Sequence, residues 1–248
     1  MNVIAPWYYL GYVIPHAYTD LDAYQFYRVA PEGMVLVTTG LDLKEFSPSA
    51  VEELLGTAWR GFDILAKRGV DRIALSGVPV AATLGREKVL AVLQEASQRT
   101  GIPCDTDIEA HIAALQQLGA DEIVLATRWA EPLNRAVVAY LQSAGIHVLA
   151  HEGAGRTFRE LKAFDPMADH NLALELGSHL LAANPTAKAL MMPGGLWFDI
   201  HAVPMLEAEF GKPVTLNITS TTWAALRALG DRAWPRSGDP WGKLLAAI

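Results

Sequence analysis

Two glycines stand directly after an apolar run in the second half of the chain, where they could hold a negatively charged ligand. Residues 189–192 predict a buried strand, and Pro193 ends it because proline has no N–H for a sheet ladder. Gly194 and Gly195 let the backbone approach a ligand closely, and a helix is expected to start near His201. A strand, a glycine turn and a helix in this order predict backbone N–H groups that bind an anion such as a carboxylate.

The first half of the chain has a matching stretch after another apolar run. Gly77, Val78 and Pro79 precede a helix that is expected to begin near Gly85. Gly77 and Gly194 stand 117 positions apart (194 − 77), close to half of the 248 residues. Two such turns that face each other would form one anion pocket. On spacing alone, they could equally be ordinary connections of an α/β protein.

Histidine is the side chain best suited to proton transfer near neutral pH. His16 follows the first expected strand, where a pocket should form, and His151 and Glu152 follow the sixth in a glycine-rich loop. These three residues are the candidate catalytic groups; the alternative is that they are ordinary loop residues. They are also types that bind divalent ions, but none shows a metal-ligand spacing, so no metal is predicted.

The order of the expected elements predicts an α/β fold with parallel sheets covered on both faces. Strands are expected at residues 10–15, 34–39, 72–76, 102–104, 122–127, 147–150, 189–192 and 213–218. Helices are expected at residues 48–68, 85–100, 107–118, 131–144, 166–183, 203–210 and 221–229, while residues 18–27 suit a helix or a loop. Because ligands bind at the carboxyl ends of parallel strands, Arg128 and Asn217 are further positions to watch.

Charge and composition bound the partners and the location. The hydrophobic content of 51% is ample for one domain or two lobes. The formal net charge is −7 and basic residues are scattered, so no nucleic acid partner is expected. No apolar run reaches membrane-spanning length and no signal-peptide pattern is present, so no membrane partner is expected. Cys104 is the only cysteine, which excludes an internal disulfide and makes the cytoplasm the expected location.

Several short stretches match one known family in order and spacing. They are Gly-Tyr-Val-Ile-Pro at 11–15, Thr-Gly-Ile-Pro-Cys at 100–104, Ala-Leu-Gln-Gln-Leu-Gly at 114–119, Ile-Val-Leu-Ala-Thr at 123–127 and Gly-Gly-Leu at 194–196. With them, the chain resembles the aspartate/glutamate racemase superfamily, most closely its branch of arylmalonate decarboxylases, maleate cis-trans isomerases and ectoine-utilisation racemase-like proteins. The resemblance implies two Rossmann-like lobes with the active site between them, residues 1–118 plus 213–248 forming the first and 119–212 the second. The last strand and helix are thus expected in the first lobe.

The resemblance also implies chemistry without a cofactor at a carbon next to a carboxylate, but this chain departs from the pattern at its chemical centre. The second-lobe cysteine position falls on Pro193, and the first-lobe position falls on Gly77, as in the decarboxylases. Val78 and Pro79 stand where hydroxyl residues are usual, and Cys104 follows a different strand. A thiol mechanism is therefore not expected.

Aromatic residues are expected to complete the pocket. Trp129 takes the place of a tyrosine hydroxyl of the decarboxylases, and its indole N–H could still donate. The first-loop motif of the family reads Pro15-His16-Ala17-Tyr18 here, so Tyr18 takes the place of a carboxylate-binding Asn. The expected substrate-binding residues are Pro15, Tyr18, Gly77, Val78, Trp129, Pro193, Gly194, Gly195 and Trp197.

The sequence thus predicts a cofactor-free enzyme for a small carboxylic acid, a decarboxylase (carbon–carbon lyase) or an isomerase with a non-thiol mechanism. A second hypothesis is a hydrolase or lyase that uses His16, His151 or Glu152, with metal assistance as an option. A third is a protein that binds a small molecule without turnover, because the family's thiols are missing. A homo-oligomer is compatible with all three hypotheses.

Overall fold

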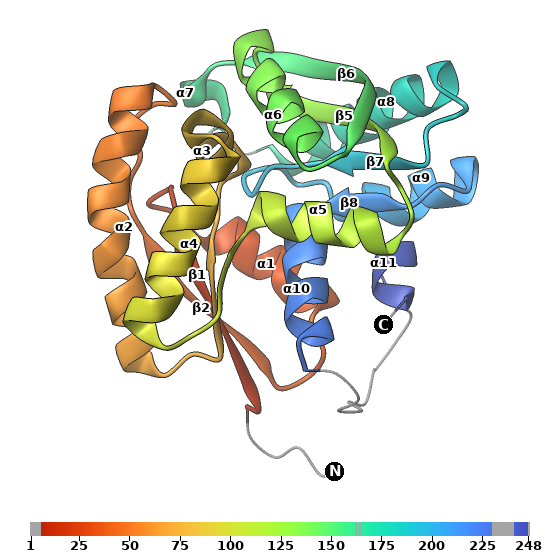
Figure 1. Ribbon diagram of the computed structural model, residues 1–248. Coiled ribbons are helices and arrows are strands. Elements are labelled where there is room, and N and C mark those ends of the chain that lie inside the picture. The colour runs from red at the N-terminus through yellow and green to blue at the C-terminus, as the bar shows by residue number, and fades with distance from the viewer. Residues whose placement is uncertain (1–5, 162, 164, 230–240, 248) are drawn as a thin grey trace.

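The computed structural model describes residues 6–161, 163, 165–229 and 241–247, which form two four-stranded sheets with flanking helices (Figure 1). The strand order is β2-β1-β3-β4 in the first sheet and β6-β5-β7-β8 in the second. All neighbouring strands run parallel. The predicted α/β class with parallel sheets is confirmed, and the second sheet repeats the strand order of the first.

The chain alternates strands and helices from end to end. The first half contains β1 (Tyr8–Ile14), α1 (Asp20–Val29), β2 (Met34–Gly40), α2 (Pro48–Arg68), β3 (Arg72–Leu75), α3 (Val78–Leu84), α4 (Arg86–Thr100), β4 (Cys104–Thr106) and α5 (Asp107–Gln117). The second half contains β5 (Glu122–Trp129), α6 (Glu131–Ser143), β6 (His147–Arg156), α7 (Phe158–Leu161), α8 (Pro166–Ala183), β7 (Ala189–Met192), α9 (Ala202–Phe210), β8 (Val214–Leu216), α10 (Asn217–Arg227) and α11 (Gly242–Ala246). None of the described helices is long and apolar enough to cross a bilayer.

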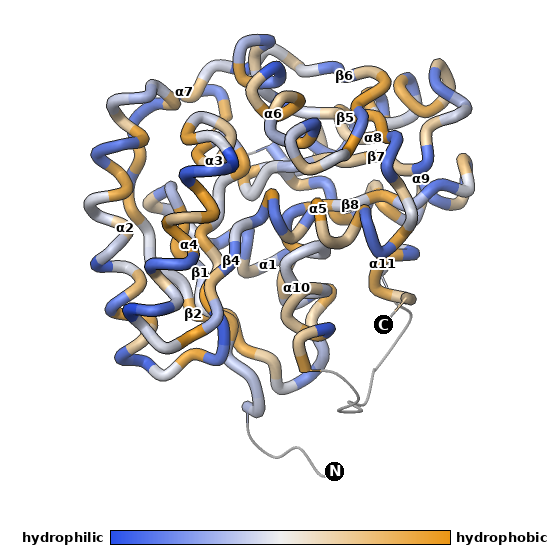
Figure 2. Tube along the Cα trace, viewed as in Figure 1, coloured by the Kyte–Doolittle hydropathy of each residue, from blue (hydrophilic) through white to orange (hydrophobic). Residues whose placement is uncertain are grey.

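Helix α2 shows how local sequence sets an element. The Ser47 hydroxyl accepts a hydrogen bond from the Ala50 N–H at 3.3 Å, and Pro48 occupies the first helical position. Gly69 ends the helix in the left-handed conformation (φ 75°). Hydrophobic and hydrophilic residues alternate along α2, so one face packs on the first sheet and the other meets solvent (Figure 2).

The structure has one helix that the sequence did not predict and one that begins earlier than predicted. Helix α3 begins at Val78, directly after the turn, because Pro79 suits the first turn of a helix, where its missing N–H is not needed. The helix expected near Gly85 is a separate one, α4. Helix α10 likewise begins at Asn217 rather than at Thr221. Both strand-to-helix turns are therefore shorter than expected, which places polar residues of the first helical turn beside the strand ends.

The expected glycine-rich loop at residues 151–155 is part of strand β6. The strand continues because its neighbour β5 runs on to Trp129, which pairs with Arg156. Residues 18–27, left open between loop and helix, include the first two turns of α1. The wrong prediction at β6 matters for the site, since it had placed His151 and Glu152 at a strand end.

The last strand corrects the expected division of the chain. Strand β8 pairs with β7 in the second sheet, so it does not return to the first lobe as predicted. Helix α10, which follows it, packs against α5 and α1. One hydrophobic cluster contains Tyr12 of β1, Val124 of β5 and Leu190 of β7, so the two sheets share a continuous core.

Candidate active site

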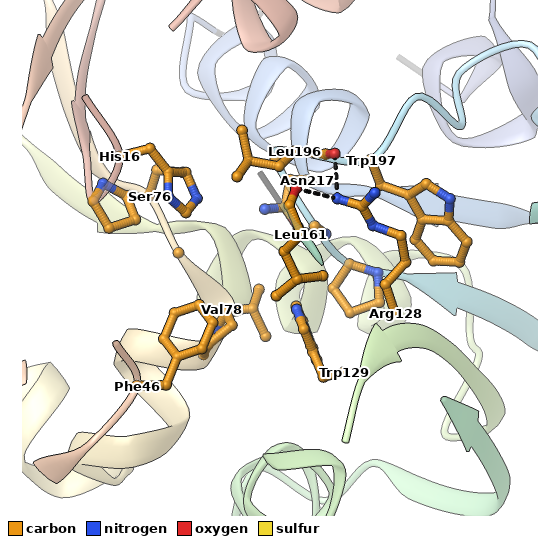
Figure 3. A pocket seen from close by; sticks show the side chains of 16 residues that line it. His16, Phe46, Ser76, Val78, Arg128, Trp129, Leu161, Leu196, Trp197 and Asn217 are labelled. Carbon is orange, nitrogen blue, oxygen red and sulfur yellow. Dashed lines mark hydrogen bonds between the residues drawn. The ribbon is translucent and has the colours of Figure 1, made fainter. Parts of the chain in front are cut away.

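A small, partly open cavity lies where the strand ends of both sheets meet. Its lining comes from the turns that follow β1, β3, β5 and β7 and from the start of α10, as expected for parallel sheets. Its volume is about 30 Å³, the scale of a water molecule rather than a substrate, so a ligand enters only with a rearrangement of the lining. Figure 3 shows His16, Ser76, Val78 and Phe46 on one side and Arg128, Trp129 and Trp197 on the other.

The turn after β3 is held by a buried carboxylate. Gly77 adopts φ 106°, and its N–H donates to Asp107 Oδ2 at 2.9 Å. The hydroxyls of Ser76 and Tyr12 donate to the same carboxylate at 2.8 and 2.5 Å. Asp107 is fully buried, which raises its pKa, although the hydrogen bonds from Tyr12, Gly77 and Ser76 act in the opposite direction.

The turn after β7 is held by a neutral pair instead. Gly194 adopts φ 151°, and its N–H donates to Asn217 Oδ1 at 3.1 Å. His111 Nε2 lies 3.1 Å from the same oxygen, and Nδ1 lies 3.0 Å from the Thr215 hydroxyl. Burial lowers the pKa of His111 to about 4, so the ring is neutral at neutral pH.

These bonds correct one part of the predicted anion site. The N–H groups of Gly77 and Gly194 are engaged by Asp107 and Asn217, so they do not face a ligand. The neighbouring N–H of Val78, the first residue of α3, has no intrahelical partner. Gly195 also lines the cavity, and a Cβ there would lie 2.6 Å from Asp22 Oδ1, so a larger residue would force the Asp22 side chain to shift.

The structure brings most of the predicted site residues together. His16 is 9% exposed and lines the cavity, with its ring centroid 6.3 Å from that of Phe158. The other predicted residues that line it are Pro15, Gly77, Val78, Trp129, Pro193, Gly194, Gly195 and Trp197.

Three predicted residues lie elsewhere. Tyr18 is 64% exposed and lines a separate surface pocket. His151 Nε2 lies 3.2 Å from Glu131, and the Glu152 carboxylate lies 2.7 Å from His179 Nδ1. His151 and Glu152 do not line the cavity, because β6 is an edge strand that continues past both residues and their side chains meet surface groups.

Arg128 lies buried in the cavity wall. In the sequence it is marked only by its place after a strand. Its Nη1 donates to both oxygens of Asp169, at 2.8 and 3.0 Å. Its Nη2 donates to the carbonyl oxygen of Leu161 at 3.1 Å and to that of Leu196 (Figure 3). The carboxylate of Asp169 neutralises the charge of Arg128, and the guanidinium connects two segments of the lining.

Two further buried acids flank the second-half turn. Burial raises the pKa of both Asp22 and Asp199 well above the ordinary value. The nearby guanidinium of Arg128 lowers the pKa of Asp199, but less than burial raises it. In the described part of the chain, no group of three or more His, Cys, Asp or Glu side chains is placed to hold a metal ion.

Comparisons with known proteins agree with this fold. A sequence model of a family described as arylmalonate decarboxylase matches residues 10–241. The arylmalonate decarboxylase of Bordetella bronchiseptica is 24% identical over 237 residues, which cover 95% of each chain. A crystal structure of liganded arylmalonate decarboxylase, with one glycine changed to cysteine and one cysteine to serine, superposes with a TM-score of 0.83 at 20% identity, covering 96% of this chain and 99% of that one. The Pseudomonas putida maleate isomerase, with a cysteine changed to alanine and maleate bound, gives 0.81 at 22% identity and coverages of 97% and 98%.

Proposed function

Because this chain belongs to the arylmalonate decarboxylase family, we propose that it is a cofactor-free enzyme that removes CO₂ from a small dicarboxylic acid. The relatives named for decarboxylase and isomerase activities share its fold over nearly the whole length. Its reaction proceeds without a thiol, since Cys104 is the only cysteine and does not line the cavity.

The carboxylate that stays on the substrate is held by backbone. Among the groups at the two turns, we assign this contact to the N–H groups of Val78 and Gly195, because those of Gly77 and Gly194 already donate to Asp107 and Asn217. Pro79 and Pro193 contribute no N–H at all. The anion site is therefore sparser than two complete turns would give.

The carboxylate that leaves is placed against apolar surface. Phe46, Trp129, Leu161, Leu196 and Trp197 line the cavity. A carboxylate held among such side chains loses hydration, which favours its loss as CO₂. When the carbon–carbon bond breaks, its electron pair stays on the substrate carbon and delocalises into the remaining carboxylate.

His16 supplies the proton that this carbon then needs. Among the described residues that line the cavity, His16 is the one whose type gives and takes a proton near neutral pH, and this observation carries the proposal. The imidazolium N–H bond breaks, a C–H bond forms at the substrate carbon, and solvent returns the proton to the ring. The second hypothesis from the sequence loses two of its three groups, because His151 and Glu152 lie outside the cavity.

The test is proton NMR of phenylmalonate incubated with the unmodified protein, His16→Gln and His151→Gln. We expect the unmodified protein and His151→Gln to form phenylacetate. We expect His16→Gln to form it at a rate at least about a hundredfold lower. If the protein converts maleate to fumarate but does not turn over phenylmalonate, it is an isomerase and the decarboxylase proposal is wrong. A melting temperature raised by phenylacetate, with no turnover of either acid, would overturn the enzyme proposal in favour of a binding protein.

A further inference from the structure

A continuous chain of hydrogen bonds runs from one glycine turn to the other. It starts at the Gly77 N–H, passes through the Asp107 carboxylate and ends at the Gly194 N–H. The link in the middle is Asn217, whose Nδ2 donates to Asp107 Oδ2 at 2.8 Å and whose Oδ1 accepts from Gly194 at 3.1 Å. Asn217 is 3% exposed and also lines the cavity.

The chemistry of the neighbours fixes the orientation of this amide. A carboxylate only accepts hydrogen bonds, so the NH₂ group of Asn217 must face Asp107. Its oxygen then faces the Gly194 N–H and His111 Nε2, which must carry the ring proton. The other ring nitrogen of His111 accepts from the hydroxyls of Thr215 and Ser220, at 3.0 and 3.2 Å. Every member of the network has a partner, so a flipped amide would place two donors, or two acceptors, against each other.

We propose that Asn217 is a positioning residue that sets the distance between the two turns that hold the retained carboxylate of the substrate. This inference depends on the proposed function for its consequence in catalysis. Asn217 bonds to Asp107, which holds the Gly77 turn, and to the Gly194 N–H of the other turn, so each of its two polar atoms serves a different half of the molecule. A shift of this residue therefore moves the Val78 side of the cavity relative to the Gly195 side. Misplacement of a substrate by about 1 Å costs on the order of a hundredfold in rate.

Two variants separate the two bonds of Asn217, and a third is the control. Asn217→Leu removes both bonds at similar side-chain volume. Asn217→Asp keeps an oxygen for the Gly194 N–H but places a second carboxylate against Asp107. As the control, Ser220→Ala removes a buried hydroxyl on the same helix. This hydroxyl contacts His111 and neither of the glycine turns. If Asn217→Leu does not fold, Asn217→Asp still decides the question.

The first measurement needs no substrate. Amide resonances of Gly77 and Gly194 are compared in ¹⁵N-labelled protein, below the melting temperature of every variant. We expect Asn217→Leu to shift and deprotect both amides, Asn217→Asp to perturb Gly77 more than Gly194, and Ser220→Ala to leave both near their original positions. If Asn217→Leu changes Gly194 while Gly77 stays unchanged, Asn217 is a local anchor and the inference is wrong.

The second measurement uses phenylmalonate and reports kcat and KM of fully folded protein. We expect kcat/KM to fall about a hundredfold in Asn217→Leu and to stay within about twofold in Ser220→Ala. An Asn217→Leu variant with unchanged kinetics would also overturn the inference. If the unmodified protein turns over no phenylmalonate, the proposed function fails for this substrate, whereas the amide shifts still decide whether Asn217 couples the turns.

Discussion

The two halves of the molecule build the same turn with different chemistry. In each half the last strand leads directly into a helix whose first residue anchors a glycine turn: Asp107 of α5 holds Gly77, and Asn217 of α10 holds Gly194. Four residues later, the helices carry His111 and Thr221, and each bonds to the anchor of the opposite half. The comparison teaches that the fold requires an acceptor at this position, while its charge is free to differ.

The difference in charge gives the two halves opposite responses to pH. Burial raises the pKa of Asp107, so this group favours folding less as the pH rises from its unfolded pKa towards the folded one. Burial lowers the pKa of His111 to about 4, so the second half loses stability as the pH falls from about 6.5 towards 4.

The largest effect is expected from breaking the charged anchor. Asp107→Leu would leave the hydroxyls of Tyr12 and Ser76, the Gly77 N–H and the Asn217 amide without their common acceptor. We expect the free energy of unfolding to fall by about 3–5 kcal/mol in urea titrations. A carboxylate at the surface serves as the control: Asp63, paired with Arg99, should tolerate the same change with a far smaller loss. Equal losses for the two variants would contradict the anchor role.

The second-half anchor should show itself through pH. Between pH 6.5 and 4, His111 binds a proton in the unfolded state but not in the folded state. The free energy of unfolding therefore falls by about 1.4 kcal/mol per pH unit as the pH is lowered, and the total loss approaches about 3 kcal/mol. His111→Gln removes the titrating group and keeps a donor for Asn217. In urea titrations, the difference in stability between the two proteins should change by about 3 kcal/mol across this window and stay constant above pH 7. A constant difference at all pH values would show that His111 contributes packing only.

The two glycines sharpen the comparison at smaller cost. Alanine at Gly77 would suffer an unfavourable φ of 106° and place Cβ 2.9 Å from Pro15 Cγ. Alanine at Gly194 would suffer strain at φ 151° but find Trp197 Cβ only at 3.6 Å. We expect losses of about 2–3 kcal/mol for Gly77→Ala and about 1–2 kcal/mol for Gly194→Ala in thermal or urea unfolding. The reverse order would mean that the second turn is the more constrained.

Much of the fold could be predicted because strands and helices carry local signals. The apolar run of β7 and the Ser47-Pro48 start of α2 are recognisable in any context. The sheet that receives β8 was not recognisable, because a three-residue apolar strand fits either sheet and only packing decides between them. The length of β6 was predicted wrongly for the same reason. Its glycines indicate a loop, but the neighbouring strand β5 provides pairing partners for these residues, so the strand continues.

The site was predictable where the chain turns sharply and not where side chains meet across the fold. Glycine and proline mark the turns at Gly77 and Gly194 directly in the sequence. In the sequence Asp107 is only the first residue of an expected helix, and nothing there indicates its hydrogen bond with Tyr12, 95 residues away. Arg128 and Asn217 were noticed only as residues after strands, and that position was the one signal that could have identified them. Their partners lie in other elements, so their roles required the structure.

The smallest effect on activity and stability is expected from changing Cys104, because this residue lies at the end of the first sheet that is remote from the cavity. Cys104 begins β4, and Asp107 stands three residues after Cys104, roughly 10 Å away at the rise of a strand. The thiol donates a weak hydrogen bond to the Ile102 carbonyl at 3.4 Å, and burial raises its pKa, so it is a poor nucleophile. Cys104→Ser should therefore leave kcat/KM for phenylmalonate unchanged within about twofold and lower stability by less than about 1 kcal/mol. Iodoacetamide should likewise leave the unmodified protein active. Complete inactivation from which substrate protects would mean that a thiol does reach the cavity, and the proton donor assigned to His16 would then have a rival.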